Sequence, residues 1–119
     1  MKKMTLTAGL FVALGATSAM AEGFTVQDLG ASDSREACMS AGESAMRRYV
    51  DVNGGGNVDP TTWVVYGWDL QPGDQDVTIM CPVVSGGIIN GFMVVHGEST
   101  DDDRIYTADT LARLFDNPK

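Results

Sequence analysis

The chain has 119 residues and a formal net charge of −8, with 16 acidic residues against 8 basic ones and a single histidine. A protein this acidic repels the phosphate backbone of nucleic acids and the headgroups of anionic lipids. The composition therefore argues against nucleic acids and membrane surfaces as partners. It leaves a basic protein, a cation or an uncharged ligand.

The start of the chain has the three-part order of a cleavable secretory signal peptide. Two lysines open it, residues 6–16 are mostly apolar, and residues 19–21 read Ala-Met-Ala, the small-residue pattern that signal peptidase recognises. The apolar stretch is shorter than the roughly 20 residues that cross a bilayer. We therefore expect residues 1–21 to be removed after Ala21. Residues 22–119 would then form one small domain in the periplasm or outside the cell, not inserted in a membrane.

Cleavage would also change the charge and give the cysteines a role. Without Lys2 and Lys3, 6 basic residues face 16 acidic ones, which makes the net charge −10. Cys38 and Cys81 would enter an oxidising compartment, where they can form only one intramolecular pair. A Cys-x-x-Cys redox motif is absent, and a lone His96 does not suggest a metal site. We expect a structural disulfide that joins a helix to the sheet.

Two helices are predicted from capping signals and apolar spacing. The first is expected near residues 33–50, because Asp33 and Glu36 have capping-box spacing and apolar residues recur at three and four positions. The second is expected near residues 101–116, where Thr100 precedes an acidic first turn.

Between these helices, β-branched and aromatic runs predict three strands, near residues 61–68, 76–83 and 88–96. Short connections favour an antiparallel meander. Residues 22–32 could add one strand or an extended arm. The predicted fold is α+β, in the order α-β-β-β-α, with a three- or four-stranded antiparallel sheet and both helices packed on one face.

The loop after the first helix offers a weak candidate metal site. Four oxygen-bearing residues fall at the first, third, seventh and ninth places of an EF-hand calcium loop: Asp51, Asn53, Asn57 and Asp59. The match is partial, since glycine occupies the fifth place and Thr62 stands where a bidentate glutamate belongs. A polar glycine-rich loop is the alternative.

Two further groups form a candidate binding surface. Strand alternation places Tyr66 and Trp68 on one face and Trp63 on the other. If both helices cover one face, the other carries exposed apolar surface, which on a small protein often marks a binding site. The acidic run Asp101, Asp102 and Asp103 could dock a basic partner, although helix capping also explains it.

These features favour a non-enzymatic binding or accessory protein over an enzyme, with no cofactor. Its partner would be a basic exported protein, although the sequence does not indicate an oligomeric state. Protein inhibitors of basic exported enzymes share the small size, acidity and disulfide, which is a likeness of class only. A small-ligand or cation-binding module is the first alternative. A small hydrolase that uses His96 is the second, although the sequence has no Gly-x-Ser-x-Gly or His-Glu-x-x-His motif.

Overall fold

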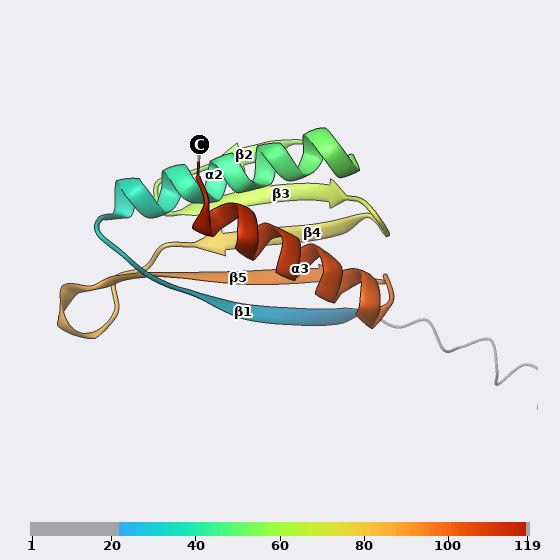
Figure 1. The fold of residues 1–119 in the computed structure, drawn as a ribbon. Helices are drawn as coiled ribbons and strands as arrows, with labels where there is room; N and C mark the ends of the chain where they lie inside the picture. Colours follow the sequence, from blue (N-terminus) through green and yellow to red (C-terminus); the bar gives the residue numbers. More distant parts are fainter. Residues whose placement is uncertain (1–21, 119) are drawn as a thin grey trace, which may run out of the picture.

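The computed structural model describes residues 22–118, which form a five-stranded antiparallel sheet and two helices (Figure 1). The strand order in the sheet is β1-β5-β4-β3-β2. None of the described helices is long and apolar enough to cross a membrane. The predicted signal peptide, residues 1–21, lies outside the described residues. The elements in chain order are β1 (Gly23–Ser32), α2 (Arg35–Asn53), β2 (Val58–Pro60), β3 (Val64–Leu70), β4 (Gln75–Met80), β5 (Ile89–Gly97) and α3 (Asp101–Asp116).

The predicted order α-β-β-β-α and the three- or four-stranded sheet are wrong, because the observed order is β-α-β-β-β-β-α. Residues 23–32 form a full edge strand, β1, which pairs antiparallel with β5. Its apolar residues Phe24 and Val26 are exposed, so its alternation does not follow the usual apolar-inside pattern. The strand β2 has only three residues and ends at Pro60, which is too short to show a periodicity.

The two helices begin at side-chain caps. Ser34, rather than the predicted Asp33, caps α2, because its hydroxyl accepts a hydrogen bond from the backbone N–H of Ala37. The helix α2 ends at Asn53 and is capped by Gly54, whose φ of 96° favours glycine. Thr100 caps α3 as predicted, and its hydroxyl accepts from the N–H of Asp103 at 3.1 Å.

Both helices lie on the same side of the sheet (Figure 1). The helix α2 packs over β2 and β3, whereas α3 packs over β1 and β5. Small residues on α2 allow a close approach, and a Cβ added at Gly42 would lie 3.1 Å from Ile79 Cγ2. The core fills the space between the layers, with side chains from β3, β4, β5 and both helices: Val65, Leu70, Val77, Ile79, Met93, Val95, Met46, Leu111 and Phe115.

The disulfide Cys38–Cys81 is present and joins α2 to the residue that directly follows β4. Both cysteines are fully buried. The predicted link between helix and sheet is therefore confirmed. It closes a loop with a sequence separation of 43 residues.

A buried polar network joins the two helices to the β3–β4 turn. The Thr107 hydroxyl of α3 accepts from Gln75 Nε2 at 2.7 Å and lies 2.9 Å from the Tyr49 oxygen of α2. The Tyr49 hydroxyl donates to the carbonyl of Gln71 at 2.6 Å, so Thr107 is the donor to Tyr49. Burial raises the pKa of Tyr49, which keeps the proton that this bond needs. Thr107 therefore links Tyr49 to Gln75, whose Nε2 also donates to the Pro72 carbonyl at 2.7 Å.

Loss of the disulfide should destabilise the fold. The chain-entropy model gives about 4 kcal/mol for a loop of this length. We expect urea unfolding of the reduced protein to have a markedly lower midpoint than that of the oxidised protein, and the double variant Cys38→Ala/Cys81→Ala to behave like the reduced form. An unchanged midpoint after reduction would contradict this role.

Replacement of Thr107 should also destabilise the protein. Thr107→Val keeps the shape of the side chain but removes the hydroxyl, which leaves the buried Gln75 amide short of a partner at a cost of about 1–3 kcal/mol. Thr110→Val is the matched control, because Thr110 lies on the same helix and is only partly buried. Urea unfolding of both variants measures the difference. Equal losses would show that the network contributes nothing specific.

Candidate functional site

The side of the sheet that faces away from both helices carries the most distinctive chemistry in residues 22–118. Register and alternation place residues of all five strands on this open face. The uncharged residues include Phe24, Val26, Val64, Tyr66, Trp68, Thr78, Met80, Asn90, Phe92 and Val94; His96 and the carboxylates Asp28, Asp59 and Asp76 lie on the same face. Phe24 and Val26 are each 68% exposed. The open face is therefore an apolar and aromatic surface that no described element covers.

One aromatic pair lies toward the β2 edge of the open face. The rings of Tyr66 and Trp68 stack with an interplanar angle of 14° and centroids 5.8 Å apart. The indole N–H of Trp68 donates to Asp59 Oδ2 at 2.9 Å. The register of β2 on β3 sets this contact, since Asp59 stands opposite Tyr66. Sequence alternation predicts that Tyr66 and Trp68 share a face, but not that Asp59 joins them.

A second aromatic pair lies toward the β1 edge. Phe24 stacks on the His96 imidazole with centroids 4.5 Å apart, and Glu22 Oε1 lies 3.4 Å from His96 Nε2. Asp76 stands opposite His96 on β4. A cleft of about 340 Å³ beside this pair is lined by carboxylates from the strand ends: Glu22, Asp74, Asp76 and Glu98. Sequence reasoning missed Phe24 as a site residue, although its alternation with Val26 was a signal.

Among residues 22–118, no hydrogen bond joins a serine to His96. Ser99, its nearest serine in sequence, donates its hydroxyl hydrogen to Gln75 Oε1 at 3.2 Å. Ser85 lies in the turn between β4 and β5, in a short 3-10 segment. The surroundings of His96 in the described residues are an aromatic ring and carboxylates.

The positive charges of the described residues are confined to the helical layer, which also carries eight of the carboxylates. The five described arginines all lie on α2 and α3, and the sequence has no lysine or arginine between Arg48 and Arg104. The open face and its margin instead carry carboxylates from β1, β2 and β4. Hydrogen bonds from Asn90 Nδ2 and from the Gly30 N–H hold the pKa of Asp28 below its usual value, which favours its charged form. An apolar centre is thus surrounded by negative charge.

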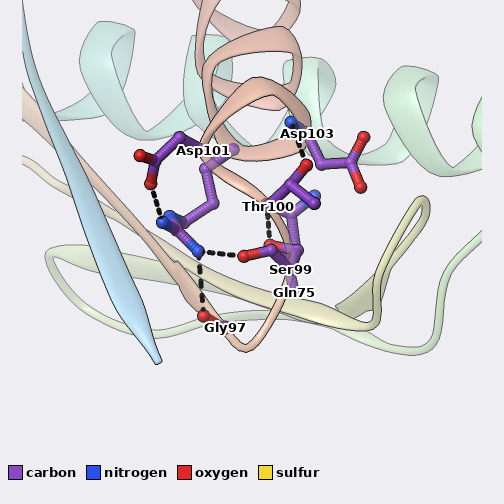
Figure 2. Close-up of polar contacts among 7 residues, drawn as sticks. Gln75, Gly97, Ser99, Thr100, Asp101 and Asp103 are labelled. Atoms are coloured by element: carbon purple, nitrogen blue, oxygen red, sulfur yellow. Dashed lines mark hydrogen bonds and ion pairs between the residues drawn. The ribbon is translucent and has the colours of Figure 1, made fainter. Parts of the chain in front are cut away.

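The acidic run at residues 101–103 belongs to the helical layer. Asp101 forms an ion pair with Arg104, whose guanidinium also donates to the carbonyls of Gly97 and Ser99 (Figure 2). The Asp103 N–H is held by Thr100. Capping of α3 therefore accounts for the position of this turn. The acidic run therefore lies in the helical layer, whereas the Tyr66–Trp68 stack lies on the opposite side of the sheet.

Trp63 stands apart from the other two aromatic residues of the predicted surface. It precedes β3 and its side chain is 44% exposed. Its carbonyl accepts a hydrogen bond from the Cys81 N–H at 2.8 Å. The three predicted aromatic residues therefore form one stacked pair and one separate exposed ring.

Three of the four residues of the calcium-like loop line one cleft, and the fourth, Asn53, is bonded elsewhere. Asn53 bonds to helix partners, since its Oδ1 accepts from the Tyr106 hydroxyl at 2.8 Å. Asp59 accepts from Trp68, whereas Asp51 and Asn57 line a cleft of about 350 Å³ with Asp59 and Arg47. No group of three or more His, Cys, Asp or Glu side chains within residues 22–118 has the arrangement of a metal site.

Comparisons with models of protein families, with curated proteins and with solved structures find no match to this chain. No relative therefore indicates a substrate or a partner. The aromatic open face with its acidic margin is the strongest functional signal in the part of the chain that the structure describes.

Proposed function

We propose that this chain is an exported, non-enzymatic binding protein that holds a basic protein partner against the open face of its sheet. One observation carries the proposal: the open face combines exposed aromatic rings with carboxylates, while all five described arginines lie on the helices. The first alternative from the sequence, a cation-binding loop, has no comparable support from the contacts of its residues.

The apolar part of the open face supports a macromolecular partner. Small monomeric proteins rarely expose contiguous apolar surface without a function, and aromatic rings are enriched where proteins bind each other. Phe24 and Val26 are more exposed than buried, and Trp68 is 41% exposed. An exposed apolar sheet face of this kind suits the surface of another protein better than a small molecule, which prefers an enclosed, concave site.

The charge of the margin supports a basic partner and disfavours a second copy of the chain. Two open faces in contact would bring like charges together, and complementary potentials are what steer and select protein partners. The predicted net charge of −10 after cleavage would extend this attraction beyond contact distance. A buried disulfide suits the oxidising compartment in which we place the encounter, the periplasm or the medium.

Two exposed valines provide a sharp test of the proposal. Val26 lies on the open face and Val52 on α2, where it is 83% exposed. Val26→Lys and Val52→Lys add the same charge to the two layers. The full-length chain, expressed for export and purified, is used to capture proteins from an extract of the cells that produce it. Each captured protein is identified by mass spectrometry, purified and bound again.

We expect a captured protein of basic isoelectric point whose affinity falls about tenfold or more for Val26→Lys, as for the centre of an interface, and less than about twofold for Val52→Lys. Raised salt should weaken both the capture and the purified complex. Equal effects of the two substitutions, salt-insensitive binding, or the absence of any basic partner would contradict the proposal.

A further inference from the structure

The Tyr66–Trp68 stack and Asp59 together form an aromatic cradle, the name used below for these three side chains. The two rings are nearly parallel and stacked, so one face of each ring is turned to the other ring and the outer faces remain for a cation. The faces of aromatic rings attract cations, and tryptophan attracts them most strongly. Trp68 is 41% exposed and therefore accessible to a partner.

Asp59 places a negative charge beside this π surface. The Trp68 indole N–H donates a hydrogen bond to Asp59 Oδ2 at 2.9 Å, which fixes the position of the carboxylate. A carboxylate has about four lone-pair sites, so it can accept further donors. A planar guanidinium can stack on a ring and donate to an adjacent carboxylate at the same time, whereas an ammonium group acts as a point charge.

The described part of the protein does not supply this cation itself. Arg47 borders the cleft next to Asp59, but its guanidinium is paired with Glu43 at 2.9 Å. No ion pair to Asp59 is present among residues 22–118. The charge of Asp59 is therefore left for a partner to match.

We propose that the aromatic cradle binds an arginine side chain of the partner, with the guanidinium stacked on Trp68 and hydrogen-bonded to Asp59. This inference rests on the proposed function and names the group that the open face selects. It also gives β2 a role, since this short strand holds Asp59 opposite Tyr66.

The two tryptophans make the cradle directly observable. Trp63 and Trp68 are exposed to a similar extent, at 44% and 41%, but only Trp68 belongs to the cradle. The full-length protein with ¹⁵N-labelled tryptophan is titrated with N-acetylarginine amide, and the two indole N–H resonances are followed by NMR. N-acetylcitrulline amide, which has the same shape without the charge, is the control probe. We expect a saturable shift of the Trp68 resonance with arginine only, and little change at Trp63.

Two aspartate variants test the role of the carboxylate. Asp59→Asn retains an acceptor for the indole N–H but removes the charge, and should weaken arginine binding roughly twofold to fivefold. Asp69→Asn is the matched control, because it removes the same charge from an exposed residue of β3 outside the cradle, and asparagine tolerates the positive φ of 56° at that position. It should leave the affinity almost unchanged.

The inference is wrong if citrulline and arginine shift Trp68 equally, if arginine leaves Trp68 unaffected, or if the two aspartate variants weaken binding equally. These results are distinct from a failure of the proposed function. If a basic partner binds the Val26→Lys variant more weakly, but arginine does not shift the Trp68 indole N–H resonance, only the cradle is refuted. Arginine bound at Trp68, in a protein that captures no basic partner, would refute only the proposed function.

Discussion

Two helices attached to one face of a sheet leave the opposite face to the solvent, and this placement underlies every other property of the molecule. Two internal interactions hold the helices in that layer. The Cys38–Cys81 bond ties α2 to the end of β4, and the hydroxyl of Thr107 connects α3 to Tyr49 and Gln75. A small domain buries a limited share of its surface, so such fixed links contribute strongly to its stability.

The helical layer also explains where the positive charges are. Arg48 donates to the carbonyl of Asn117 at 2.8 Å, near the C-terminal end of α3, and Arg104 donates to the carbonyl of Gly97. These arginines therefore satisfy backbone groups next to the helices. The strands contain aspartates but no lysine or arginine. The uncovered face therefore carries negative charge. Protein recognition through that face follows as the proposal most consistent with its chemistry.

Sequence signals that act within a few residues, such as helix caps, predicted much of the secondary structure. Contacts between residues far apart in the sequence could not be predicted in this way. Thr100 and the acidic turn after it located α3, because capping acts within one turn. The nearby Ser34 and Asp33 were not distinguished, since either can cap a helix at that point. Phe24 and His96 are far apart in sequence and meet only through the pairing of β1 with β5.

The same distinction applies to the candidate site. Alternation along a single strand placed Tyr66 and Trp68 on one face, but the contribution of Asp59 depends on the register of β2 against β3. An exposed apolar strand such as β1 also defeats pattern-based reasoning, which assumes that apolar residues point inward. The features that sequence analysis missed are therefore those that make the open face unusual.

The central claim, that one face of the sheet is uncovered, can be measured by hydroxyl-radical footprinting of the dilute protein with detection by mass spectrometry. The chain offers matched pairs of side chains on the two faces: Phe24 against Phe115, and Met80 against Met93. The structure predicts rapid modification of Phe24, clear modification of Met80, and strong protection of Phe115 and Met93. Protection of Phe24 and Met80 to the same degree as their buried counterparts would contradict it.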